Sequence, residues 1–173
     1  LLGEKFHSPL QPFGGSEEIT WSPDGKKLIY TSKKLHGTAS AVSTNADLYQ
    51  YDLSTGETTN LTQGMMGYDV SPVFSPDGKK LAWLSMEKDG FEADKNRLRI
   101  MDLESRQEKD LTASVDLSVN EFAWHPSKEI IYFTATTKAT KQLYSIDIKT
   151  GKIQQLTFDR CDYVSFSVMK DRI

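Results

Sequence analysis

The residues that could carry out chemistry are few and widely separated in this 173-residue chain. The three histidines, His7, His36 and His125, lie far apart, and His125 occupies a motif position that two other copies fill with serine. There is no G-x-S-x-G segment, which would mark an exposed nucleophilic serine, and no H-E-x-x-H or comparable metal-binding spacing. The sequence therefore predicts no catalytic residue and no metal site in this chain.

Two groups of side chains remain as candidates for binding. Tyr68 and Asp69 follow the segment GMMG, and an aromatic ring beside a carboxylate could contact a peptide side chain and its ammonium group. The second group lies in the polar segment 86–97, which lacks the alternating ligands of a calcium loop. Its members are Glu87, Glu92, Asp94, Asn96 and Arg97. The alternative is structural: Asp69 would cap its own turn, Tyr68 would pack on the next unit, and the loops would merely pack on neighbouring units.

An internal repeat carries these candidates. The first signature reads WSPDGKKLIYTS at 21–32, FSPDGKKLAWLS at 74–85 and, in degenerate form, WHPSKEIIYFTA at 124–135. A second signature follows each copy, and it reads LYQYDLSTGETTNLT at 48–62, LRIMDLESRQEKDLT at 98–112 and LYSIDIKTGKIQQLT at 143–157. A fourth unit begins with VSFSVMKDRI at 164–173. The aromatic residues Trp21, Phe74, Trp124 and Phe166 share one register and should be buried between units.

Each unit is predicted to form four short strands. In the second unit these are 69–75, 79–85, 97–103 and 107–112. Ser75-Pro76-Asp77-Gly78 is a turn, in which proline presets φ and glycine takes positive φ. The 79–85 strand is apolar on both faces and should be covered on both, whereas the 107–112 strand is more polar and should be more exposed.

Four-stranded antiparallel sheets that recur about every 50 residues are typical of a β-propeller. The prediction is an all-β propeller segment with a lead-in at 1–16, blades at 17–62, 63–112 and 113–157, and the start of a further blade at 158–173. Propellers have about four to eight blades, so we expect a piece of a longer chain. In isolation this piece should self-associate through its open blade faces, be domain-swapped, or survive as a stable proteolytic core.

The connections from strand two to strand three, and from one blade to the next, emerge on the same face of a propeller. Three of them, at 33–46, 63–69 and 86–97, are longer than a minimal connection requires. Such loops often carry function. This face is therefore the predicted binding face, with Tyr68 and Asp69 at the rim of the central channel.

Composition excludes several classes of partner. The formal net charge is −3, so the chain lacks the basic surface expected of a nucleic-acid-binding protein. No apolar run approaches the roughly 18 residues of a membrane span. Cys161 is the single cysteine, so no disulfide can form within the chain.

One segment resembles a known family. The SPDGK turn is shared by many propellers, TolB-like ones included. The longer segment LTQGMMGYDVSPVFSPDGKKLAWLSMEKDGFEADKNRLRIMDL, at 61–103, resembles the propeller of the prolyl oligopeptidase family of serine peptidases. The similarity is to its bacterial type-five dipeptidyl peptidase and acylaminoacyl-peptidase-like branch, as it is for GEKFHSPLQPFGG at 3–15 and STNADLYQYDL at 43–53.

The resemblance implies a seven- or eight-bladed propeller that precedes a C-terminal α/β-hydrolase domain with a Ser-Asp-His triad. The implied partners are that domain, the remaining blades and short peptides, and the implied role is to limit peptide access in an exopeptidase. Triad chemistry requires no cofactor. The family also favours a periplasmic or extracytoplasmic location. Its acidic anchor for the substrate amine matches no residue here. The alternative is a TolB-like or other propeller scaffold without enzyme activity.

Overall fold

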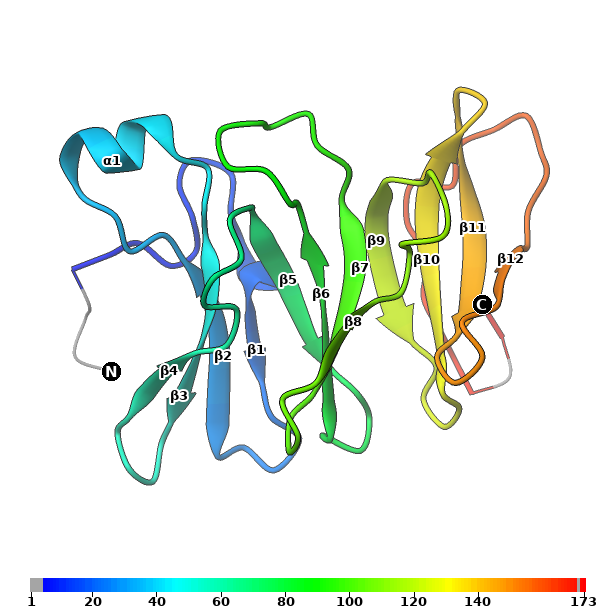
Figure 1. Cartoon of the computed structure of the whole chain (residues 1–173). Helices are drawn as coiled ribbons and strands as arrows, with labels where there is room; N and C mark the ends of the chain where they lie inside the picture. The colour runs from blue at the N-terminus through cyan, green and yellow to red at the C-terminus, as the bar shows by residue number, and fades with distance from the viewer. Residues whose placement is uncertain (1–4, 171) are drawn as a thin grey trace.

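Three four-stranded antiparallel sheets stand side by side in the computed structural model, which describes residues 5–170 and 172–173 (Figure 1). The first contains β1 (Ile19–Trp21), β2 (Lys27–Ser32), β3 (Asp47–Asp52) and β4 (Thr58–Asn60). The second contains β5 (Asp69–Phe74), β6 (Lys80–Ser85), β7 (Arg97–Asp102) and β8 (Glu108–Asp110). The third contains β9 (Val119–Trp124), β10 (Ile130–Thr137), β11 (Thr140–Asp147) and β12 (Ile153–Gln155). Each sheet follows chain order, so the predicted fold class is confirmed.

Two short helical segments accompany the sheets, η1 (Ser16–Glu18) and α1 (Gly37–Val42). The sequence predicts a plain loop at 33–46, but α1 forms inside it. Six residues are too few for an independently stable helix, so α1 depends on its contacts with neighbouring segments. Among the described residues, no helix has the length and apolar character needed to cross a membrane.

Four-residue turns close the hairpins between the first two strands of each blade, with the sequence SPDG in the first two blades and HPSK in the third. In the second blade the Ser75 hydroxyl donates to Asp77 Oδ1 at 2.6 Å, and the Gly78 N–H donates to the Ser75 carbonyl at 2.8 Å. Gly25 and Gly78 have φ angles of 69° and 70°, which confirms the predicted positive φ. In the third blade, His125 Nδ1 accepts the N–H groups of Ser127 and Lys128, as the predicted structural role requires.

The hydrophobic core lies between the sheets, in two layers. In one layer the second sheet packs Phe74, Leu81, Trp83 and Met101 against Ile29, Leu48 and Leu61 of the first. In the other layer the third sheet packs Trp124, Ile131, Phe133, Tyr144 and Ile146 against Ala82, Leu84, Leu98, Ile100 and Leu111 of the second. The central sheet is thus covered on both faces, as the apolar pattern of the 79–85 strand predicts. Strand β8 is mostly exposed, also as predicted.

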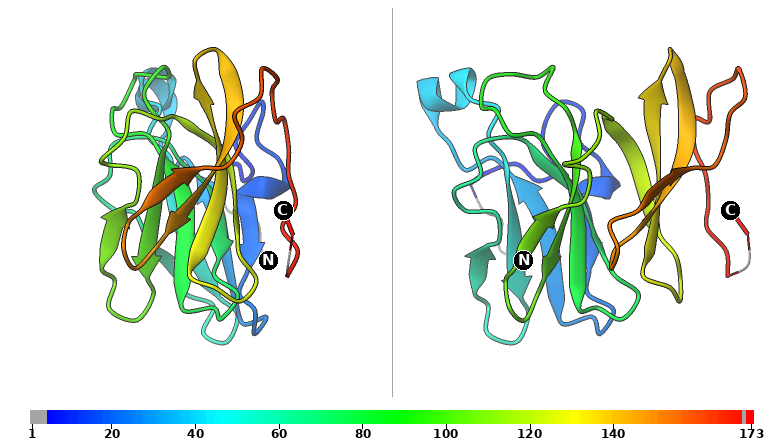
Figure 2. Two further views of the ribbon diagram at one scale, coloured as in Figure 1. Left: turned by 90° about the vertical axis from the view of Figure 1, so that its right-hand side faces the viewer. Right: turned by 45° about the vertical axis from the view of Figure 1, so that its right-hand side comes forward.

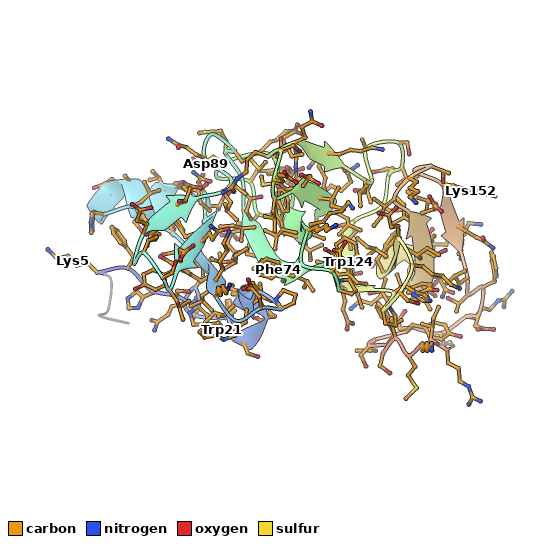
Figure 3. The ribbon with its side chains drawn as sticks, turned by 90° about the horizontal axis from the view of Figure 1, so that it is seen from below. Lys5, Trp21, Phe74, Asp89, Trp124 and Lys152 are labelled. Atoms are coloured by element: carbon orange, nitrogen blue, oxygen red, sulfur yellow. The ribbon has the colours of Figure 1, made fainter. Side chains whose placement is uncertain are left out.

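The shared register of Trp21, Phe74 and Trp124 is confirmed, but their burial differs (Figure 3). Phe74 and Trp124 are 8% and 9% exposed, as predicted. The burial predicted for Trp21 is wrong in this chain, because it lies on the outer face of the first sheet and is 55% exposed. Phe166 is half-buried. Residues 158–170 form no strand, although the repeat predicts one there, because a first strand needs a second strand to pair with.

The long connections gather at one end of the sheets, as predicted (Figures 1 and 2). The lead-in (blue), α1 (cyan) and the 86–97 connection (green) lie at this end, which we call the loop face. Backbone hydrogen bonds join the connections at 33–46, 63–69 and 86–97: the Asp69 N–H donates to the Ala46 carbonyl, and the Met86 N–H donates to the Tyr68 carbonyl. The opposite end carries the short turns.

The turn glycines should be intolerant of substitution. Gly25→Ala and Gly78→Ala should each lower the free energy of unfolding by about 1 kcal/mol or more, because alanine is strained at positive φ. Gly78→Ala should cost more, since its Cβ would lie 3.3 Å from the Pro23 ring, whereas a Cβ at Gly25 meets open space. Denaturant midpoints test this, and unchanged midpoints in both variants would contradict it.

Packing between sheets should depend on Phe74. Phe74→Ala should cost about 3–5 kcal/mol, because it removes a buried ring from the layer between the first two sheets. Leu53→Ala is the control, since Leu53 is 46% exposed in a turn at the opposite end from the loops. A Phe74→Ala variant as stable as the Leu53→Ala variant would show that this layer contributes little.

Candidate functional site

A groove of about 840 Å³ opens on the loop face. Residues 10–13 of the lead-in form one side, and residues 41–44 and 90–93, from the connections of two adjacent blades, form another. Lys33, Tyr68 and Met86 complete the lining. Three apolar side chains of this groove are open to solvent, since Phe13, Val42 and Phe91 are 93%, 71% and 47% exposed. The groove therefore combines an apolar wall with a few polar groups, as peptide-binding and ligand-binding sites commonly do.

Asp89 joins the two connections that form the blade side of the groove (Figure 3). Its Oδ1 atom accepts hydrogen bonds from the Ser43 hydroxyl at 2.7 Å, the Thr44 N–H at 2.7 Å and the Asn45 N–H at 3.2 Å. In return, the Gly90 N–H donates to Thr44 Oγ1 at 2.9 Å. The Ser43 hydroxyl and the backbone N–H groups lower the pKa of Asp89, so its carboxylate stays charged at neutral pH. The two loops thus form one connected wall.

Two further sets of contacts, one partly buried and one buried, hold the remaining segments. Lys33 Nζ donates to the carbonyls of Ser40 and Ser43 at the end of α1. The ammonium group of Lys33 is therefore engaged within the fold. On the lead-in side, the Leu10 N–H donates to Glu18 Oε2 at 2.6 Å, and Glu18 is 4% exposed. Burial raises the pKa of Glu18, while this hydrogen bond opposes the rise.

Tyr68 lines the groove at the point where the second blade begins. Burial, together with the negative charges of Glu18, Glu92 and Glu17, raises the pKa of Tyr68. The hydroxyl therefore remains protonated at neutral pH and can donate a hydrogen bond. The preceding residue, Gly67, must be glycine because the backbone of Met86 lies very close to it. A Cβ added at Gly67 would lie 1.8 Å from the Met86 carbonyl oxygen. Tyr68 thus lies on the loop face, and its contact with substrate remains a prediction.

Asp69 differs from its predicted place at the channel rim. It is fully buried, and Trp83 Nε1 donates to its Oδ1 atom at 2.9 Å. Burial raises the pKa of Asp69 to about 7, and the nearby polar groups of Ser85, Trp83 and Thr62 counteract part of this rise. The equivalent position in the third blade holds Val119, which is also fully buried. A side chain in this position cannot reach a ligand in the groove without a rearrangement.

Three of the other predicted residues are engaged within their own loop. Arg97 Nη2 contacts Glu87 Oε2 at 2.8 Å, and its Nη1 contacts Asp94 Oδ2 at 3.4 Å. Asp94 Oδ2 also accepts the N–H groups of Glu87 and Lys88, which closes the loop on itself. These contacts shape the 86–97 connection, and a role of Glu87, Asp94 and Arg97 in binding substrate remains a prediction.

The last two predicted residues lie in different surroundings. Asn96 connects the second and third blades, because its N–H donates to Ser118 Oγ and its carbonyl accepts the Val119 N–H. Glu92 is exposed and lines the groove. The structure therefore brings Tyr68 and Glu92 together in the groove and places the other five candidates outside it. Within the described residues, no cluster of acidic, histidine or cysteine side chains is arranged to hold a metal ion.

Sequence reasoning missed the apolar wall and the residue that joins its loops. Phe13 lies in the lead-in, Val42 in α1 and Phe91 in an otherwise polar segment, so no single stretch shows that they meet. The sequence signal that could have indicated this wall is the presence of large apolar residues inside long polar loops. Asp89 gave no signal, since an aspartate before glycine is common in turns.

The repeated sheets and their loop face define this chain as part of a β-propeller. A family model described as PD40, the TolB beta propeller domain, matches residues 19–172. The chain therefore belongs to this family.

The relatives of the chain include much longer proteins. Dipeptidyl-peptidase 5 of Porphyromonas gingivalis is 45% identical over 171 residues, which cover 99% of this chain and 25% of that protein. Dipeptidyl-peptidase 5 of Porphyromonas endodontalis is 44% identical over 168 residues, with 97% and 24% covered. TolB from Acinetobacter baumannii aligns with a TM-score of 0.59 and 28% identity, over 84% of this chain and 33% of TolB. The chain spans about a quarter of the length of these two peptidases, and the resemblance noted from its sequence is confirmed.

The buried Asp69 should make stability depend on pH. Its pKa of about 7 lies above the ordinary value of 3.8, so the folded state binds more protons than the unfolded state between these values. The free energy of unfolding should therefore fall as the pH rises from about 4 to 7, and Asp69→Asn should remove that fall.

The control for this experiment is Asp89→Asn. The pKa of Asp89 is lowered, so its stabilising contribution is present in full above its ordinary pKa of 3.8. Asp89→Asn should therefore lower stability by a similar amount at each pH from about 4 to 8 and leave the slope between pH 4 and 7 unchanged. Denaturant midpoints measured from pH 4 to 8 test both variants. An unchanged slope between pH 4 and 7 in Asp69→Asn would contradict the buried-carboxylate account.

Proposed function

We propose that this chain is the non-catalytic propeller segment of a dipeptidyl peptidase and that its loop face guides short peptides toward a catalytic domain elsewhere in the protein. The groove between the lead-in and two adjacent blades carries the proposal, because it is open, partly apolar and lined by Tyr68 and Glu92. Two relatives named dipeptidyl-peptidase 5 support the substrate class.

The groove suits a peptide on chemical grounds. Phe13, Val42 and Phe91 offer apolar contact to a side chain, and the Tyr68 hydroxyl can donate to a peptide carbonyl. Glu92 offers a negative charge, while the lysine of the lining already donates to main-chain carbonyls. The local charge thus favours neutral or cationic ligands over anionic ones.

A propeller scaffold without enzyme activity is the second candidate, and the likeness to TolB favours it. The two candidates differ in the residues that follow the propeller in the longer protein. A G-x-S-x-G segment followed in order by Asp and His supports the peptidase. A chain that ends after the remaining blades supports the scaffold.

Groove residues should affect turnover more than stability. In the full-length protein, Tyr68→Ala and Glu92→Gln should each lower kcat/KM on short peptides about tenfold or more, equivalent to about 1.4 kcal/mol of transition-state stabilisation. Each removes a polar group that faces the groove. Thermal stability should remain within a few degrees of the unaltered protein.

The matched control is Glu57→Gln, because Glu57 is exposed in a turn at the opposite end of the sheets. It removes the same charge and should leave kcat/KM unchanged. If Tyr68→Ala and Glu92→Gln behave like this control, or lower stability alone, the groove does not contact the substrate.

A further inference from the structure

We propose that the loop at 10–14 determines which peptide side chains the groove accepts, and that Glu18 is the positioning residue that holds this loop. The inference rests on the function proposed above, because it assigns a role to one wall of the same groove. The group that this wall fits is a large apolar side chain of a short peptide.

The 10–14 loop belongs to a connection that is longer than its counterparts. The described part of the segment that enters the first blade runs from residue 5 to residue 18, whereas residues 61–68 and 111–118 enter the second and third blades. Figure 2 shows the longer segment (blue) at the loop face. Since the shorter connections are enough to enter a blade, the 10–14 loop is not required to connect strands. Loops that exceed this requirement are frequently functional.

Hydrogen bonds at both ends fix the backbone of this loop. At one end, the Gly14 N–H donates to the Leu10 carbonyl at 2.7 Å. At the other end, the Leu10 N–H donates to Glu18 Oε2 at 2.6 Å, in a buried position. The Leu10 side chain is also buried, so apolar packing accompanies the two hydrogen bonds. The loop is thus tied to η1, which leads directly into β1.

The Glu18 carboxyl group packs closely against the loop. A Cβ added at Gly14 would lie 2.6 Å from Glu18 Oε2 and 2.5 Å from the Leu10 carbonyl oxygen, so only glycine allows this approach. Removing the carboxyl group would leave the buried Leu10 N–H without its acceptor and would open space beside Gly14. The 10–14 loop should then lose its fixed position.

A fixed loop gives the groove a fixed wall. Phe13 lies within the loop, lines the groove and is almost fully exposed. Phe91 lines the groove from another side, close in sequence to Asp89, which joins two connections by hydrogen bonds. Each of these two walls therefore carries an exposed aromatic ring and is held by a carboxyl group. Two rings held in place can both contact a large apolar side chain, whereas an alanine side chain offers much less contact area.

Amide hydrogen exchange in the full-length protein tests the positioning role. Exchange measured by mass spectrometry over residues 10–14 should be at least about tenfold faster in Glu18→Ala than in the unaltered protein, because the loop loses its hydrogen bond to Glu18. Glu18→Gln should retain most of the protection, since its amide oxygen can still accept from the Leu10 N–H. Glu17→Ala is the control, because Glu17 is exposed and its Oε1 atom accepts the Gly15 N–H outside the loop.

A second variant displaces the loop and leaves Glu18 in place. Gly14→Ala puts a Cβ against the Glu18 carboxyl group, so it should also accelerate exchange over residues 10–14 at least about tenfold. This variant carries the test if Glu18→Ala does not fold. Exchange as slow in Glu18→Ala and Gly14→Ala as in Glu17→Ala would overturn the positioning role.

Peptide selectivity tests the role of the loop itself. The readout is kcat/KM for a short peptide with one phenylalanine side chain, divided by kcat/KM for the same peptide with alanine there, and each peptide position is tested in turn. At one position this ratio should fall about fivefold or more in Phe13→Ala and Glu18→Ala, mainly through KM, because the contact contributes to binding. Glu18→Gln and Glu57→Gln should leave the ratio unchanged.

The outcomes separate this inference from the proposed function. If Tyr68→Ala lowers kcat/KM while Phe13→Ala leaves the ratio unchanged at every peptide position, the groove binds peptides without selection by the loop, and this inference alone is wrong. If Tyr68→Ala and Glu92→Gln behave like Glu57→Gln, the proposed function is wrong and this inference with it. A ratio that falls equally in Glu18→Gln and Glu18→Ala would show that Glu18 acts through its charge, which overturns the positioning role.

Discussion

Burial of sheet faces between adjacent blades is the interaction on which the rest of this structure depends. A four-stranded sheet with two apolar faces cannot remain exposed in water, and the central sheet here is covered on both sides by its neighbours. The aromatic and aliphatic residues of this packing recur at fixed positions in the repeat. That recurrence sets the order, spacing and relative orientation of the blades.

The loop face is a consequence of this packing. Because neighbouring blades lie side by side in the same orientation, their long connections come together, and Asp89 joins two of them across the blade boundary. The groove therefore belongs to no single blade. It exists because the lead-in and two connections, separated by up to about 80 residues in sequence, are held at one end of the sheets.

The repeat made the fold predictable, whereas the site was predictable only in part. Strand positions, turn geometry and the shared loop face follow from local patterns that appear two or three times. Asp69 was misplaced because a carboxylate beside a tyrosine gives no sign of burial, and only the tertiary contact with Trp83 reveals it. Trp21 follows the same pattern as Trp124 but is 55% exposed, because burial of this position depends on packing between sheets and not on the local pattern. Groove residues such as Phe13 and Phe91 meet through long-range packing, which no local pattern encodes.

A structure of the full-length protein with a non-hydrolysable short peptide tests the central claim most directly. The account predicts that the peptide lies on the loop face, with one side chain against Phe91 and a polar atom within hydrogen-bonding distance of the Tyr68 hydroxyl. A peptide bound entirely within another domain, with the groove filled by side chains of that domain, would contradict it.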